Sequence, residues 1–146
     1  MGKAQQAVAL HGRGCNCAQA VLCAFAGELG LEEQSALRIA TGFGGGMGRT
    51  GSTCGAVTGA YMVLGLARGM RDPEEKSRKD ATYTLVREFA ERFQKKQGAV
   101  GCRELLGVDV STVEGLKLAH ERDLFSTRCN ELIRDAVNVL QGVLKE

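Results

Sequence analysis

The sequence lacks tryptophan altogether, and it contains one proline and two tyrosines among 146 residues. It is also poor in the alternating β-branched residues that form strands, which argues against a β-sheet. A surplus of charge of one sign is missing as well: the formal net charge is +2, and basic residues are interleaved with acidic ones. This charge pattern gives no reason to expect nucleic-acid binding. Alanine, leucine, glutamate and arginine are abundant, and because these residues favour helices the composition predicts an all-α protein.

No convincing secretory signal is present, because the apolar run after Arg13 is interrupted by Asn16 and Gln19 and no clean cleavage site follows. Residues 50–67 carry no charge over 18 positions, but the glycines, serine and threonines among them favour a buried helix over a membrane span. We therefore expect a cytoplasmic protein without membrane insertion. In a reducing cytoplasm six cysteines suit redox or metal chemistry better than permanent disulfides.

Apolar residues at helical spacing, separated by capping residues, predict a compact bundle of about six helices that forms one domain over residues 1–146. One of these helices, at about residues 54–67, is almost wholly apolar and rich in glycine and alanine, so we expect it to be central and enclosed on most sides. Gly51, Gly55 and Gly59 recur at intervals of four. Such a face lets another helix approach closely, either inside the subunit or across the interface of a homodimer, and we predict a homodimer.

A glycine-rich loop precedes this helix, with six glycines among the ten residues from Gly42 to Gly51. Glycine allows the backbone to adopt positive φ angles and to pass close to a ligand. The candidate cofactor-binding residues of the loop are Gly44, Gly45, Gly46 and Gly48. Two nucleotide-binding motifs match only in part. The dinucleotide pattern lacks a preceding strand, and the P-loop pattern has Arg49 in place of its lysine, so we expect no bound nucleotide.

Four of the six cysteines are predicted to lie in the opening turn of a helix, namely Cys17, Cys54, Cys102 and Cys129. A helix N-terminus carries a partial positive charge, and it favours the reactive thiolate over the thiol. We expect Cys54 to be the attacking thiolate, because the flexible glycine loop before it would leave it accessible.

The remaining cysteines and the histidines give weaker indications. Cys23 is expected in the apolar core, and Cys15 forms with Cys17 a C-x-C pair, which is a weak metal pattern by itself. His11 and His120 are expected to be surface or packing residues and not metal ligands.

Four blocks of sequence, in this order, carry a resemblance to a known family: residues 16–21, 54–59 and 102–107, and the helix opened by Cys129. They resemble the C_GCAxxG_C_C family of redox-active proteins, and the match covers nearly the whole chain. The resemblance implies a small, mainly helical protein of bacterial or archaeal origin, with Cys17, Cys54, Cys102 and Cys129 as its family cysteines. It supplies no demonstrated reaction. Some relatives are multihaem cytochromes, but this chain has no C-x-x-C-H motif, so no covalent haem is expected.

Two redox mechanisms fit these four cysteines, which we regard as the candidate catalytic and metal-binding residues. Two of them could cycle between dithiol and disulfide, or all four could hold an iron–sulfur cluster beside the loop amides. Either mechanism would use an electron-transfer partner. A structural zinc site, and a helical dimer whose cysteines are only core residues, remain as non-catalytic alternatives. The spacings do not choose between these mechanisms, and they name no substrate.

Overall fold

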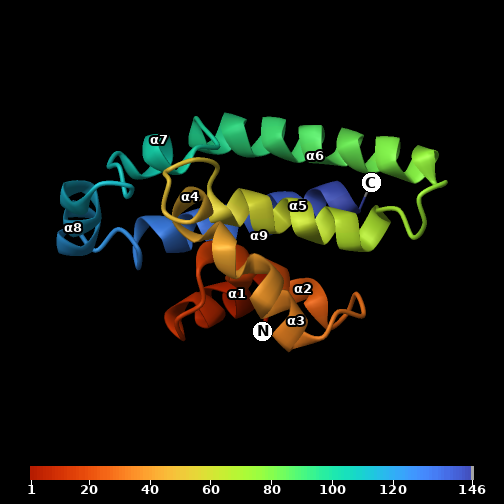
Figure 1. The fold of residues 1–146 in the computed structure, drawn as a ribbon, viewed down its shortest axis with the longest axis horizontal. Coiled ribbons are helices and arrows are strands. Elements are labelled where there is room, and N and C mark those ends of the chain that lie inside the picture. The colour runs from red at the N-terminus through yellow and green to blue at the C-terminus, as the bar shows by residue number, and fades with distance from the viewer. Residues whose placement is uncertain (146) are drawn as a thin grey trace.

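The long helices form the body of the protein, which is described by a computed structural model over residues 1–145. Helix α6 (Lys76–Gln97) covers one side of α5 (Gly55–Arg68) and α9 (Arg128–Leu144). Helices α1 (Lys3–Gly12), α2 (Cys17–Ala26) and α3 (Glu33–Ala40) lie on the opposite side, where α2 contacts α5 and α1 contacts α9 (Figure 1). The helices therefore stack in three layers, with α5 and α9 between the other two.

The short elements gather at one end of these layers. They are the 3₁₀ helix η1 (Thr41–Phe43), α4 (Gly44–Met47), α7 (Cys102–Leu106) and α8 (Val113–Glu121). Figure 1 shows α4, α7 and α8 at the end where α5 and α9 begin. The first residues of these two helices and the short elements are thus brought together in space.

The predicted all-α class agrees with the structure, which is mostly helical and has no β-strand in residues 1–145 beyond one isolated bridge between Thr53 and Gly101. The chain forms more helices than the about six predicted, because short turns such as α4 and α7 are separate elements. The described residues contain no helix long and apolar enough to cross a membrane.

The predicted apolar helix is α5, which begins at Gly55 and not at Cys54. Its residues from Gly55 to Ala60 are buried, whereas Leu66 in its last turn is 36% exposed. The prediction of a central helix that is enclosed on most sides is therefore not confirmed.

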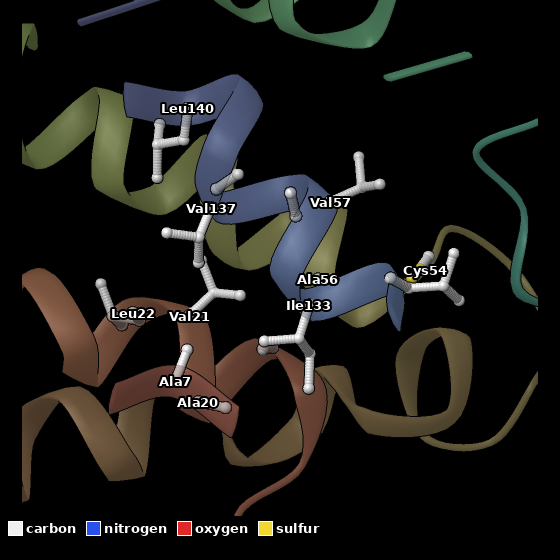
Figure 2. Packing of buried hydrophobic residues seen from close by; sticks show 14 of the residues in the cluster. Ala7, Ala20, Val21, Leu22, Cys54, Ala56, Val57, Ile133, Val137 and Leu140 are labelled. Carbon is white, nitrogen blue, oxygen red and sulfur yellow. The ribbon is translucent and has the colours of Figure 1, made fainter. Parts of the chain in front are cut away.

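Side chains from α2, α5 and α9 meet in the core that joins the layers. Figure 2 shows this packing of small and branched side chains. The labelled core residues of these three helices are Ala20, Val21, Leu22, Ala56, Val57, Ile133, Val137 and Leu140. On the other side of α5, Phe89 and Phe93 of α6 are fully buried, and Phe89 meets the ring of Tyr61 edge-on at 5.8 Å between centroids.

Glycines allow α5 and α2 to approach closely. A Cβ atom at Gly59 would lie 2.8 Å from the carbonyl oxygen of Ala18, and one at Gly55 would lie 3.0 Å from the Ala18 nitrogen. The small-residue face from which a homodimer was predicted is thus occupied by α2 of the same chain. It gives no support for a dimer.

Candidate functional site

Cys17 is the first residue of α2, and its position is fixed by the cap in front of it. The Asn16 side chain accepts a hydrogen bond of 2.9 Å from the Gln19 N–H, and the Gln19 side chain accepts one of 2.9 Å from the Asn16 N–H. This reciprocal arrangement is a capping box. The side-chain amide of Asn16 also donates a hydrogen bond of 3.0 Å to the carbonyl of Thr41. The start of α2 is therefore bound to the segment that leads into the glycine loop.

Cys54 and Cys102 are placed by a short antiparallel pairing around the bridge between Thr53 and Gly101. The Cys54 N–H donates to the carbonyl of Val100 at 2.9 Å, and the Cys102 N–H donates to that of Ser52 at 2.6 Å. Residues two apart on an extended strand share a face, so Cys54 and Cys102 are diagonal neighbours on one face of the pairing. Cys102 opens α7, whereas Cys54 is the N-cap of α5 and lies just before the helix in which it was predicted.

Cys129 is the second residue of α9. Its N–H donates to the carbonyl of Leu124 at 2.9 Å. The preceding Arg128 donates from Nε to the carbonyl of Leu105 at 3.0 Å, which ties the start of α9 to α7. The start of α9 is therefore fixed against α7 by a bond independent of the cysteines.

The glycine loop forms a left-handed turn over these helix starts. Five consecutive residues, Gly45 to Arg49, have φ angles between 62° and 71°. The turn is closed by hydrogen bonds from the N–H of Gly51 to the carbonyl of Gly45 at 3.1 Å and from the N–H of Ser52 to that of Gly46 at 2.9 Å. L-residues disfavour this conformation, which explains why three of the five are glycine.

Gly46 brings this turn against Cys102. A Cβ atom at Gly46 would lie 2.7 Å from the Cβ of Cys102 and 2.7 Å from the nitrogen of Ser52. Neither distance is compatible with a side chain larger than hydrogen. The loop is therefore in van der Waals contact with one of the candidate site cysteines.

A cavity of about 730 Å³ lies between the loop and the helix starts. All four predicted site cysteines and all four predicted loop glycines line it: Cys17, Cys54, Cys102, Cys129, Gly44, Gly45, Gly46 and Gly48. Cys15 lines it as well, whereas Cys23 does not. The fold thus brings together the predicted residues from segments far apart in the sequence, and all six cysteines are free thiols.

The pKa values of Cys17 and Cys129 are shifted in opposite directions. The hydrogen bond between their side chains raises the pKa of Cys17 well above its ordinary value and lowers the pKa of Cys129. These directions correspond to a Cys17 thiol that donates its S–H to a Cys129 thiolate. The charge of Arg128 also favours the Cys129 thiolate.

The other two cysteines favour the protonated form. Burial raises the pKa of Cys54 to about 11, although the backbone N–H groups of Ala56 and Val57 act in the opposite direction. Burial, followed by the charges of Cys54 and Cys129, raises the pKa of Cys102 to about 12. The expectation that the glycine loop would leave Cys54 accessible is wrong: its exposed fraction is 4%. Desolvation of the thiolate outweighs the favourable effect of the helix N-terminus.

The sequence matches, over residues 15–143, the family described as "Putative redox-active protein (C_GCAxxG_C_C)". The chain belongs to this family. The matched segment contains every one of the four site cysteines and the whole glycine loop. No curated protein and no solved structure matches the chain.

Sequence reasoning missed several polar residues of this C_GCAxxG_C_C protein that line the cavity. Both His11 and His120 lie on its wall, together with Arg49 and Asn130. His11 Nδ1 lies 2.7 Å from Asn130 Oδ1, and the His120 ring packs on that of Phe125 at 5.0 Å between centroids. The histidines come from α1 and α8, so only the folded chain brings them to one cavity and no spacing pattern could have indicated them.

The four thiols of the C_GCAxxG_C_C site are soft ligands, of the type that binds zinc or iron–sulfur clusters. Within residues 1–145, however, no group of three or more His, Cys, Asp or Glu side chains is arranged as ready-made metal ligands. The donor chemistry of the four thiols nevertheless fits such a centre.

Proposed function

We propose that this protein is a thiol redox protein in which Cys17 and Cys129 cycle between a dithiol and a disulfide. The observation that carries the proposal is the hydrogen bond between these two side chains, which lowers the pKa of one and raises that of the other. One thiolate beside one thiol is the arrangement that disulfide exchange requires, because the thiolate attacks and the second sulfur resolves the intermediate. Membership of a family described as redox-active supports the same chemistry.

The reaction begins when the Cys129 thiolate attacks one sulfur of a substrate disulfide. The substrate S–S bond breaks, a mixed disulfide forms on Cys129, and the first half of the substrate leaves as a thiolate. The Cys17 sulfur then attacks the Cys129 sulfur, gives up its proton and releases the second half as a thiol. Two electrons have passed to the substrate, and the protein is left with a disulfide between Cys17 and Cys129. A dithiol electron-transfer partner would return it to the reduced state.

Cys54 and Cys102 would assist from the wall of the cavity. With pKa values raised to about 11 and 12, both are protonated near neutral pH and do not compete with Cys129 as nucleophiles.

A titration with redox buffers tests the proposal. The full-length protein would be equilibrated with mixtures of reduced and oxidised dithiothreitol, trapped with an alkylating reagent and mapped by mass spectrometry. We expect one disulfide, between Cys17 and Cys129, and its loss in Cys17→Ser and Cys129→Ser. Cys23→Ser is the matched control, because Cys23 does not line the cavity. A disulfide between other cysteines, or none at any ratio of the buffer, would refute the dithiol mechanism.

An iron–sulfur cluster on all four cysteines is the second candidate. It is favoured by the mutual effect of the four groups, since the charges of Cys54, Cys102 and Cys129 all raise the pKa of Cys17. Bound metal would deprotonate the thiols, and the amides of the glycine loop would be available to its sulfurs. This candidate predicts iron, inorganic sulfide and visible absorbance in protein purified without oxygen. Iron would be lost in each of the four Cys→Ser variants and retained in Cys23→Ser.

A structural zinc site is the non-catalytic alternative. It predicts unfolding on addition of a chelator, with no dependence of stability on redox potential.

A further inference from the structure

We propose that the cavity binds the anionic group of its substrate, so that the disulfide reduced by Cys17 and Cys129 is a small organic disulfide that carries a carboxylate. This inference rests on the proposed function. It is carried by the charges of the cavity wall, the position of Arg49 and the mixture of apolar and polar side chains around the sulfurs.

Arg49, His11 and His120 line the cavity, but none of the aspartates and glutamates within residues 1–145 does. Glu104 and Asp109 act on Cys102 from outside the wall. Of these, Asp109 is held by the hydroxyl of Ser111 at 2.5 Å and by an ion pair of 3.5 Å with Arg103. An anion in the cavity would therefore meet positive charge without a facing carboxylate on the wall.

Arg49 carries the main positive charge. Within residues 1–145 its guanidinium forms no hydrogen bond or ion pair, whereas Arg71, Arg103 and Arg128 are each paired with a carboxylate. The side chain packs on Gly45, where a Cβ atom would lie 2.6 Å from Arg49 Cγ. Its backbone is held at φ 62° by a hydrogen bond of 3.0 Å from its N–H to the carbonyl of Gly44. The left-handed turn therefore holds an unpaired guanidinium at the cavity wall.

The rest of the wall fits a small organic molecule. The contact of His11 Nδ1 with Asn130 Oδ1 orients the imidazole on the cavity wall. Apolar side chains also line the cavity, namely Leu106, Val110, Leu116 and Phe125. They would contact the carbon chain that joins the carboxylate to the disulfide.

Two alkylating reagents of similar size and different charge test the anion site without any redox step. The rates of modification of Cys129 by iodoacetate and by iodoacetamide would be measured on the reduced full-length protein, each relative to 2-mercaptoethanol. We expect the normalised rate with iodoacetate to exceed that with iodoacetamide. The ratio of the two rates should fall about five-fold in Arg49→Gln, which is the scale of one partly solvated ion pair. It should also fall as salt is added, because salt screens the charge of Arg49. Arg87 is an exposed residue of α6 and lies outside the cavity. Arg87→Gln removes the same charge and should leave the ratio of the two rates unchanged.

A second set of reagents tests the substrate class. Dithiodipropionate, hydroxyethyl disulfide and cystamine are short disulfides with anionic, neutral and cationic ends. We expect the first to oxidise the protein fastest, relative to its reaction with 2-mercaptoethanol, and Arg49→Gln to slow only this reaction.

The two experiments separate the two proposals. An iodoacetate preference without oxidation by any disulfide would refute the redox function and leave the anion site standing. Oxidation at rates independent of charge, with Arg49→Gln indistinguishable from Arg87→Gln, would refute the anion site. Failure of both reagents to modify Cys129 in the folded protein would also refute it, because the cavity would then be closed to small anions.

Discussion

At the scale of single residues, Cys17 and Cys129 have opposite pKa shifts, and we propose them as the reacting pair. The thiol of Cys17 stabilises the thiolate of Cys129 through one hydrogen bond. Burial alone would have raised the pKa of both groups, as it does for Cys54 and Cys102. We therefore expect the acidity of Cys129 to depend on a neighbour 112 positions away and not on its helix N-terminus alone.

Replacement of Cys17 by alanine should make Cys129 less acidic. Only the thiolate is alkylated, so the rate rises with pH through the pKa, and loss of the donor moves this rise to higher pH. We expect an upward shift, because the thiolate loses the donor that stabilises it. The measurement is the pH profile of alkylation of Cys129, followed by mass spectrometry. Cys17→Ser, which keeps a donor, should shift the profile less, and an unchanged profile in Cys17→Ala would contradict an interaction between the two sulfurs.

The glycine loop provides a second test at this scale. Gly46→Ala should destabilise the protein by about 3 kcal/mol, because a side chain there combines a positive φ angle with contacts of 2.7 Å to Cys102 and Ser52. Gly48→Ala is the matched control: its φ angle is also positive, at 63°, but the nearest atom would be 3.9 Å away. Gly48→Ala should lower the free energy of unfolding by about 1 kcal/mol. Urea denaturation measures both values, and equal losses of stability would show that the contact between Gly46 and Cys102 is not restrictive.

At the scale of helices, α5 and α2 depend on small residues where they touch. Glycine inside a helix is ordinarily less stable than alanine by about 1 kcal/mol, so its presence in α5 calls for a packing reason. Gly59 has one, since it lies against the backbone of Ala18, whereas Gly65 in the same helix has nothing within 4 Å of a Cβ position.

The two glycines of α5 should therefore respond to alanine in opposite directions. Gly59→Ala should lower the free energy of unfolding by about 2 kcal/mol, and Gly65→Ala should raise it by up to about 1 kcal/mol. Denaturant titrations would measure both, and sedimentation would report the oligomeric state. A Gly59→Ala protein that kept its stability but changed its oligomeric state would instead support the homodimer.

Helix boundaries show how far local sequence patterns reach. The start of α2 has a local signature, because Asn16 and Gln19 form a capping box within one turn. The segment Asp72-Pro73-Glu74-Glu75 has the residue types of a helix start as well, but no helix begins there. The side chain of Glu75 turns back to the N–H of Arg71 at 2.7 Å and to its guanidinium at 2.9 Å, and α6 begins only at Lys76. This ion pair stabilises a tight turn where the sequence pattern indicates the first turn of a helix.

At the scale of the whole molecule, the cavity depends on contacts between segments that are far apart in the sequence. Helical periodicity predicted that Cys17, Cys54, Cys102 and Cys129 open helices, or nearly so, but it could not predict that these openings face one another. That convergence depends on the pairing of residues 52–54 with 100–102 and on the contact between Arg128 and Leu105. Neither has a local signature. The cavity histidines and Arg49 were missed for the same reason, since their importance comes only from what they face.

Oxidation should stabilise the whole fold. A disulfide between Cys17 and Cys129 would close a loop of about 110 residues, and the loss of entropy in the unfolded chain is worth about 4 to 5 kcal/mol for a loop of this length. The urea midpoint of the oxidised protein should therefore exceed that of the reduced protein. In Cys129→Ser the two midpoints should coincide, and a redox-dependent midpoint in that variant would point to a different pair.

The pairing beside the site also has a consequence for dynamics. The N–H groups of Cys54 and Cys102 are themselves the donors of the two hydrogen bonds that flank the Thr53–Gly101 bridge, to Val100 and to Ser52. Their exchange with deuterium requires those bonds to open, and opening would separate the two cysteine-bearing segments. We expect both amides to exchange at one common rate, and to exchange more slowly when the cavity is filled. The exchange rate of these two amides would thus measure how often the site opens to solvent.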